Sequence, residues 1–148
     1  MIRHLILIIV VIAGAGIPVQ VASNARLEKA VKSATLSVAI SFFVGGLAMA
    51  ALTMAGVLGR ADLAGASSAP WWAWIGGLIS AGIVIASIIA LPQSGAGAVI
   101  AATVFGQLII AAVLDHFGWL GVPQIRINWY RACGAVLLLG GALLMQHK

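Results

Sequence analysis

The sequence predicts an all-α integral membrane bundle of five transmembrane helices, forming one membrane domain over residues 1–148. Of the 148 residues, 63% are hydrophobic and 7% are charged, and the mean hydropathy is +1.16. A soluble domain of this size could not hide so much apolar surface from water, so its solvent must be lipid. A helix needs roughly 20 apolar residues to cross a bilayer core, and five stretches approach that length. The predicted helices are 5–24, 35–58, 71–91, 96–114 and 127–145.

The first apolar stretch follows Arg3 and precedes small residues near Ala25, a pattern that also occurs in secretory signal peptides. Its apolar run is longer than the core of a typical signal peptide, so we expect a spanning helix. Pro18 lies inside this helix and removes one of its hydrogen bonds, which makes it the candidate hinge.

The third and fourth stretches are separated only by Pro92-Gln93-Ser94-Gly95. This segment is uncharged and consists of residues that favour turns. We therefore expect the two flanking helices to form a tight antiparallel hairpin.

The eight Lys and Arg residues divide evenly between the two sides of the predicted bundle. Basic loop residues set the orientation of a membrane protein, whereas acidic residues contribute little. The chain therefore has no electrostatic preference for either orientation, although chance alone gives an even split about a quarter of the time. The side of the N-terminus holds Arg3, Arg60, Arg126 and Arg131, and the opposite side holds Arg26, Lys29, Lys32 and Lys148.

Aromatic residues are distributed unevenly, because every Trp and the one Tyr fall near the side of the N-terminus. Trp and Tyr anchor membrane proteins at the lipid–water interface. If the chain inserts in both orientations and pairs head to tail, an antiparallel homodimer has an aromatic belt in both leaflets. The two-fold axis of such a dimer lies in the membrane plane, so that one site can face either side. The aromatic residues are Trp71, Trp72, Trp74, Trp119, Trp129 and Tyr130.

Polar side chains at membrane depth need a protein partner or a watery cavity. Gln107 lies near the middle of the fourth predicted helix, where it either bonds a neighbouring helix or contacts a solute. Gln20 and Asn24 are one helical turn apart and form a polar stripe just beyond Pro18. This stripe is either an interfacial helix end or a binding surface. The candidate solute path comprises Gln20, Asn24, Gln107, Trp71 and Trp72.

Asp115 and His116 end the fourth predicted helix. Asp115 is the only acid bordering an apolar span, and with His116 it could carry protons or couple an ion to transport. The structural alternative is an interfacial pair with Arg131 or Arg126 as counter-charge. The hydroxyl residues of the spans are expected to bond the backbone of their own helices. They are Ser37, Ser41, Thr53, Ser80, Ser87 and Thr103.

Enzymatic chemistry finds no support in the sequence, and we expect no catalytic residue, no metal and no cofactor. The chain has no nucleophile elbow, phosphate-binding loop or zinc-binding helix pattern, and its single Cys133 excludes a disulfide framework. The formal charge of +5 comes from residues scattered around helix ends. Such residues contact anionic lipid headgroups, so we expect membrane lipid and no nucleic acid as a partner.

The chain resembles the YdcZ-like family, a five-helix group of the drug/metabolite transporter superfamily. This resemblance covers nearly the whole chain and implies a small, multi-pass inner-membrane protein of prokaryotes, related to the four-helix small multidrug resistance transporters. It also implies dual topology and oppositely oriented pairs, both known in that family. The motifs that carry it are Ile17-Pro18-Val19-Gln20, Asn24-Ala25-Arg26-Leu27, Ser41-Phe42-Phe43-Val44-Gly45, Pro70-Trp71-Trp72-Ala73-Trp74-Ile75-Gly76-Gly77, Gly106-Gln107-Leu108 and Asp115-His116-Phe117-Gly118.

Two departures limit what this resemblance implies. The third helix reads Leu78-Ile79-Ser80-Ala81-Gly82-Ile83-Val84, where many relatives carry a Gly-rich stretch and an aromatic residue. The acid that small multidrug resistance proteins carry in the first helix is missing, since Glu28 lies beyond it.

The leading hypothesis is a transporter of an unidentified small solute, working as an inverted homodimer. The alternatives are a dual-topology ion channel and a membrane structural or assembly protein that transports nothing.

Overall fold

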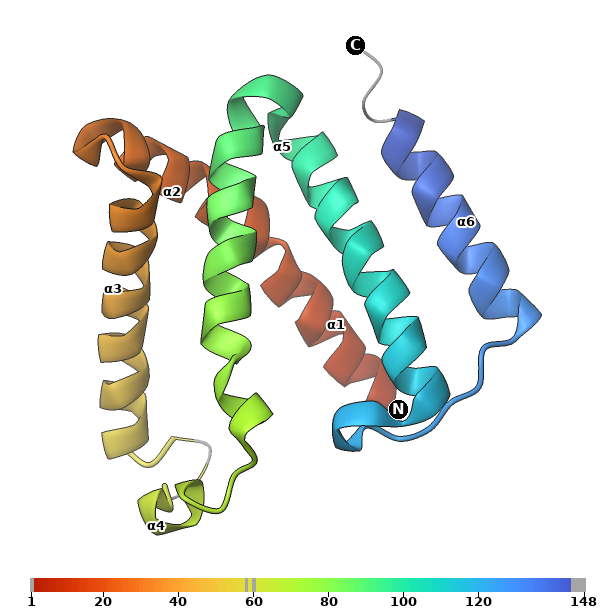
Figure 1. Cartoon of the computed structure of the whole chain (residues 1–148), viewed down its shortest axis with the longest axis horizontal. Coiled ribbons are helices and arrows are strands. Elements are labelled where there is room, and N and C mark those ends of the chain that lie inside the picture. The colour runs from red at the N-terminus through yellow and green to blue at the C-terminus, as the bar shows by residue number, and fades with distance from the viewer. Residues whose placement is uncertain (1, 58, 60, 145–148) are drawn as a thin grey trace. The chain divides into compact units, whose positions relative to one another are not determined.

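The computed structural model is helical throughout its regular elements and describes residues 2–57, 59 and 61–144 (Figure 1). For residues 2, 3, 63 and 142 it describes the backbone alone. The all-α prediction is confirmed for this part of the chain. The elements in order are α1 (Ile2–Gly14), α2 (Gly16–Val31), α3 (Ala34–Met54), α4 (Leu63–Ala66), the 3-10 turn η1 (Trp71–Trp74), α5 (Gly76–Phe117), the 3-10 turn η2 (Trp119–Gly121) and α6 (Trp129–Leu144).

Three helical stretches within the described residues are long and apolar enough to cross a membrane. Two of them have the length of a single crossing or slightly more. The third is 47 residues long, or roughly 70 Å as a straight helix, about twice the thickness of a bilayer core. It could therefore supply two crossings if the chain reverses within it. The three stretches are His4–Val31, Ala34–Met54 and Trp71–Phe117.

The first predicted helix is built from α1 and α2, which are separated by a turn at Ala15. Pro18 explains the position of this turn, because it has no N–H for the carbonyl of Gly14 and its ring crowds that carbonyl. The helix then continues past Asn24 as far as Val31. Arg26 and Lys29 consequently lie on a helix, where the sequence predicted a loop.

The chain reverses between α2 and α3 over only two residues. Lys32 adopts a left-handed backbone conformation with φ 55°, which ends α2. Ser33 then caps α3, with its side-chain oxygen accepting a hydrogen bond from the N–H of Leu36 at 3.2 Å. A side-chain cap of this kind satisfies one of the free N–H groups at a helix start. This short turn fixes α2 against the first turns of α3.

The long helix α5 is interrupted at Gly95, where φ is 75° and ψ is 162°. The break falls inside the predicted connection, but the helix continues through Pro92, which the sequence placed in the turn. Gly95 is the residue that permits the break, since this region of backbone conformation is essentially closed to residues with a Cβ. The antiparallel arrangement of the two flanking segments stays a prediction.

Other helix boundaries differ from the predicted ones by a few residues. Helix α3 ends at Met54, the third predicted helix begins with the 3-10 turn η1, and α6 starts at Trp129. The short helix α4 was not predicted; Asp62 caps it by accepting a hydrogen bond from Gly65 N–H at 3.0 Å. The predicted ends at residues 58 and 145 lie outside the described residues, as do Arg60 and Lys148 of the charge count.

The chain divides into two compact units. The terminal unit comprises Met1–Val19 and Ala90–Lys148, and the middle unit comprises Gln20–Ile89. Few apolar side chains are buried in either, while most of the large apolar side chains of the spans are exposed. This distribution suits lipid as the solvent, because lipid tails are as apolar as the side chains they cover. The buried apolar residues are Val21, Ala25, Val38, Val84 and Ile88 in the middle unit and Ala98 and Val99 in the terminal unit.

Replacing Gly95 by Ala tests the break in α5. The variant places a Cβ where the backbone conformation excludes it, so we expect the free energy of unfolding to fall by about 1–3 kcal/mol. The measurement is unfolding by sodium dodecyl sulfate in mixed micelles, followed by circular dichroism. Gly82→Ala in the same helix is the matched control, because no atom lies within 4 Å of an added Cβ there. Equal stability of the two variants would show that α5 does not need the break.

Candidate functional site

Asn24 is a buried polar residue of the middle unit, with only 4% of its surface exposed. Two hydroxyl groups of α3 reach it from the neighbouring helix. Ser37 Oγ donates a hydrogen bond to the backbone carbonyl of Asn24 at 2.7 Å. Ser41 Oγ donates to the side-chain oxygen, Oδ1, of the same residue. Asn24, Ser37 and Ser41 therefore form one polar contact between α2 and α3, here called the Asn24 cluster.

The amide nitrogen of Asn24, Nδ2, is buried and has no hydrogen-bond partner among the described residues. A primary amide carries two N–H donors on this nitrogen. Leaving a buried donor unpaired costs about 1–3 kcal/mol, because the group has lost its hydrogen bonds to solvent. Ser41 occupies Oδ1 and thereby fixes the orientation of the amide. The cluster thus holds the N–H donors of the Asn24 amide in a defined direction. Leaving these donors unpaired lowers the stability of the fold.

The positions of Ser37 and Ser41 explain how the cluster forms. They are one helical turn apart and so lie on one face of α3. The two-residue turn at Lys32 and Ser33 brings that face against α2. The prediction that both hydroxyls bond the backbone of their own helix is wrong for these two residues. The signal for this contact in the sequence is the presence of two serines four residues apart in a largely apolar helix.

Three other hydroxyl groups of the spans behave as predicted. Thr53, Ser87 and Thr103 each donate to the carbonyl four residues earlier in their own helix, at 2.8 Å. Such bonds satisfy a hydroxyl at membrane depth without help from another helix. These three residues therefore give no reason to assign them a function.

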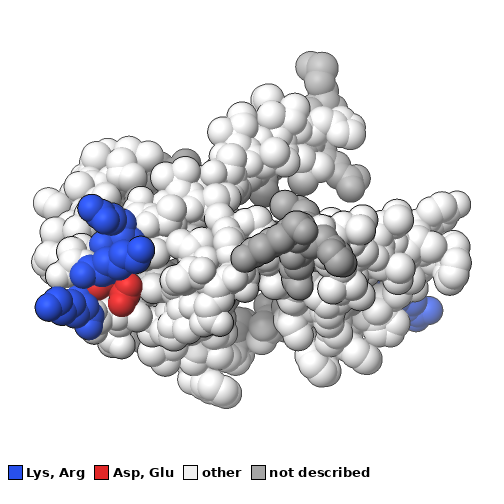
Figure 2. Space-filling view, turned by 90° about the horizontal axis from the view of Figure 1, so that it is seen from above, with Lys and Arg blue, Asp and Glu red and all other residues white. Residues whose placement is uncertain are grey.

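A group of charged residues follows the Asn24 cluster along the chain. Arg26, Lys29 and Lys32 are exposed, and Glu28 is half-buried among them. In Figure 2, Lys and Arg side chains gather in one place beside an acidic side chain, over the end of α2. Positive charge is favourable near the C-terminus of a helix, where the free carbonyl groups carry partial negative charge. The group also suits contact with anionic lipid headgroups.

Gln20 lies in the same unit as Asn24 and one helical turn before it. Its side chain is exposed, whereas Asn24 is buried, so the predicted polar stripe is exposed at one end and enclosed at the other. Trp71 and Trp72 are also exposed and belong to η1. Figure 1 shows η1 at the end of the middle unit opposite the turn between α2 and α3. The structure therefore does not bring these two Trp residues to the Asn24 cluster.

Gln107 belongs to the part of α5 that follows Gly95, in the terminal unit. Its side chain is exposed and makes no hydrogen bond with any described residue. The sequence predicted that this amide faces a neighbouring helix or a cavity. No described residue supplies that contact, so the expectation stays a prediction.

Asp115 and His116 have separate partners at the end of α5. Asp115 Oδ2 accepts from Arg131 Nη1 at 2.9 Å, with both side chains about one third exposed (31% and 35%). The counter-charge anticipated from the sequence is therefore Arg131. His116 Nδ1 accepts a hydrogen bond from the backbone N–H of Ile127 at 3.2 Å.

Backbone contacts hold the segment after α5 against the helix end. The N–H of Ile125 donates to the carbonyl of Asp115 at 2.7 Å, and Gln124 Nε2 donates to the carbonyl of His116 at 3.0 Å. Gln124 also belongs to this site, and the sequence did not predict its contact. An exposed ion pair typically contributes about 1 kcal/mol or less, so the segment depends on the whole set of contacts. Whether Asp115 and His116 also couple an ion to transport stays a prediction.

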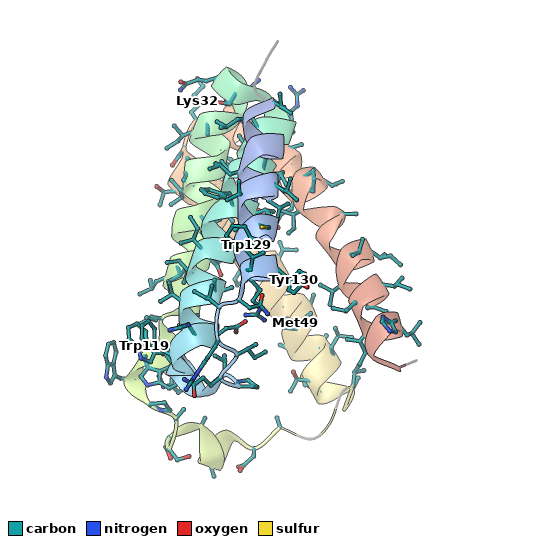
Figure 3. All side chains as sticks on the ribbon, turned by 90° about the vertical axis from the view of Figure 1, so that its right-hand side faces the viewer. Lys32, Met49, Trp119, Trp129 and Tyr130 are labelled. Atoms are coloured by element: carbon teal, nitrogen blue, oxygen red, sulfur yellow. The ribbon has the colours of Figure 1, made fainter. Side chains whose placement is uncertain are left out.

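Aromatic residues surround this helix end. Phe117 stacks on Trp119, with ring centroids 5.0 Å apart. Figure 3 shows Trp119 beyond α5, and Trp129 and Tyr130 at the start of α6. All four side chains are exposed, as expected for aromatic anchors at a lipid–water interface. In the described part of the chain, no three His, Cys, Asp or Glu residues are grouped closely enough to hold a metal ion.

Comparison with known families finds a match over most of the chain. Residues 5–144 match the model of a family described as "Putative inner membrane exporter, YdcZ". This range runs from α1 into α6 and contains every residue of the candidate site. No curated protein and no solved structure matches the chain.

The Asn24 cluster makes a prediction about stability. Ser41→Ala leaves Asn24 without its Oδ1 partner, so we expect the free energy of unfolding to fall by about 1–3 kcal/mol. The double variant Asn24→Leu with Ser41→Ala removes both polar groups and should return to within about 1 kcal/mol of the original protein. Titration with sodium dodecyl sulfate measures both values. Thr53→Ala, which removes a bond within one helix, is the control. A double variant less stable than Ser41→Ala alone would contradict this interpretation.

Proposed function

We propose that this chain, which belongs to the YdcZ family, exports a small solute across the prokaryotic inner membrane as a pair of oppositely inserted copies. The family description supports the general activity, and the long apolar helices support the location. In this proposal the chain crosses the membrane five times, with α5 crossing twice by reversing at Gly95. Helix α6 supplies the fifth crossing.

The observation that carries the proposal is a set of polar groups in the spans for which the described residues offer no hydrogen-bond partner. Asn24 Nδ2 is buried and unpaired, and the amide of Gln107 is exposed on an apolar helix. Hydrocarbon offers such groups no hydrogen bonds, so leaving them unpaired is costly. A solute path between helices gives these groups something to bind. Gln20 and Asn24 of the middle unit and Gln107 of the terminal unit are the proposed solute contacts.

The chemistry of the Asn24 cluster favours a solute that carries an oxygen acceptor. Ser41 occupies the acceptor atom of the Asn24 amide, which leaves the N–H groups free to donate. Arg26, Lys29 and Lys32 follow within the next eight residues and outnumber the single Glu28. A neutral or anionic solute fits these groups better than a cation, which would need buried acids.

Two oppositely inserted copies fit the charge and aromatic patterns of the sequence. The even split of Lys and Arg gives no preferred orientation, and a head-to-tail pair places exposed aromatic residues in both leaflets. A pair also offers ten helices to enclose a path. The symmetry of an inverted pair lets the path open to either side by exchanging the conformations of the two copies.

Pro18 is the proposed hinge of this exchange. The helix is interrupted at Ala15, and the chain passes from the terminal unit to the middle unit directly after Val19. Asn24 lies just beyond this point. A bend at Pro18 would therefore change the direction of the helix that carries the Asn24 cluster.

Export is tested by comparing solute pools in a bacterial host. The double variant Asn24→Leu with Ser41→Ala is predicted above to keep its stability while losing the donor of the path. We expect at least one small solute to accumulate in the medium with the original protein and to fall about tenfold or more with the double variant. Mass spectrometry of medium and cell extract measures this, at equal protein levels in the membrane. Identical pools with the original protein and with the empty host would contradict export.

Dual insertion makes a prediction about single charges. Lys29→Gln leaves four basic residues against three and should place the N-terminal side in the cytoplasm; Arg126→Gln should do the reverse. The orientation is measured with C-terminal fusions to alkaline phosphatase, active outside the cytoplasm, and to green fluorescent protein, fluorescent inside it. Both fusions should report with the original sequence, and each variant should silence one of them. A single-sided signal from the original sequence would contradict dual insertion.

A further inference from the structure

Gln107 lies close to the middle of an apolar helical segment. This segment extends from the break at Gly95 to the end of α5 at Phe117. At 1.5 Å per residue it is about 33 Å long, close to the thickness of a bilayer core, and Gln107 is about 18 Å from its start and 15 Å from its end. If the segment spans the membrane, this amide lies near the midplane.

The described residues of the terminal unit leave the surface around Gln107 open. Its side chain is exposed, and so is that of Ala111, one turn later on the same face. The adjacent Gly106 has no atom within 4 Å of the position of a Cβ. Small residues of this kind allow the backbone of a second helix to approach closely in lipid. An exposed amide in an otherwise apolar surface identifies this face as one that another polar group must cover.

We infer that Gln107 binds Gln107 of a second, oppositely inserted copy, through a reciprocal pair of amide hydrogen bonds. The inference rests on the inverted pair of the proposed function. A two-fold axis in the membrane plane moves a residue at one depth to the same depth on the opposite side of the midplane. Only a residue near the midplane can therefore meet its own counterpart across the axis. Gln107 satisfies this condition.

The amide group is chemically suited to pair with itself. Each amide donates one N–H to the carbonyl oxygen of the other and accepts one in return. The second N–H and the second lone pair of each amide stay free, so the pair can also border a solute path. An acid or a base at this position would have no such self-complementary partner.

Cysteine cross-linking tests the contact in membranes. In a Cys133→Ala background, Gln107→Cys should give a covalent dimer on mild oxidation, because the inferred contact brings the two positions together. A disulfide forms only where the two Cα atoms are about 4.4–6.8 Å apart. Ile109→Cys is the matched control, since it lies two residues away, at nearly the same depth but on the opposite face of the helix. Efficient cross-linking at both positions, or at neither, would overturn the inference.

A second pair of positions reports the orientation of the two copies. Thr103 and Ala111 lie one turn before and one turn after Gln107. Around an inverted contact, Thr103→Cys of one copy meets Ala111→Cys of the other, so that a covalent dimer forms when the two variants are co-expressed. Each variant expressed alone should form about tenfold less covalent dimer, because the sulfurs of its two copies are about 12 Å apart along the helices. Stronger cross-linking of each variant alone would indicate a parallel contact and would overturn the inference.

Dimer affinity provides a measurement without cysteines. Gln107→Ala should weaken the dimer about fivefold to tenfold, the expected effect of losing two hydrogen bonds between membrane helices. Ile109→Ala should leave affinity unchanged within about twofold. Single-molecule photobleaching in dilute liposomes counts the copies in each complex. If the topology fusions report both orientations but Gln107→Ala dimerises normally, the Gln107 contact is wrong while the inverted pair stands. A single-sided topology signal would overturn both.

Discussion

Polar groups in the hydrocarbon core of a bilayer must find their partners in protein, because no water is present to serve instead. Helices meet this requirement for the backbone. Side chains in this structure meet it in two different ways. Thr53, Ser87 and Thr103 bond a carbonyl of their own helix, and Ser37 and Ser41 bond Asn24 across two helices. The remaining groups, Asn24 Nδ2 and the Gln107 amide, have no hydrogen-bond partner among the described residues, and from them we infer that the chain works with a second copy and a solute.

Backbone breaks determine where the chain can change direction. Pro18 interrupts the first span one turn before its own position, and Gly95 interrupts α5. The two compact units are joined near these residues, after Val19 and after Ile89. A helix resists bending elsewhere, because its hydrogen bonds are intact. In the proposed function, Pro18 is also the hinge between the two units.

Much of the fold could be predicted from the sequence, because apolar length and the positions of Gly and Pro are local properties. The helical class and the break near Gly95 follow from such properties alone. The extension of α2 to Val31 did not, since Arg26, Glu28 and Lys29 are good helix formers as well as loop residues. The Asn24 cluster was only half predicted. Asn24 stood out as a polar residue, but the role of Ser37 and Ser41 depends on the turn at Lys32, where a residue other than glycine adopts a left-handed conformation. The partner of Gln107 could not be predicted from the sequence of one chain, because the partner that we infer belongs to a second copy.

The most direct test of an inverted pair counts accessible sites in each dimer. Ile125→Cys in a Cys133→Ala background places one thiol in the exposed segment after α5. Intact cells are treated with a maleimide that cannot cross the membrane, and the dimers are then extracted and weighed by native mass spectrometry. If the two copies are inserted oppositely, every dimer should carry a single label, on one of its two copies. Dimers that carry either two labels or none would show that both copies face the same way, and would contradict the account.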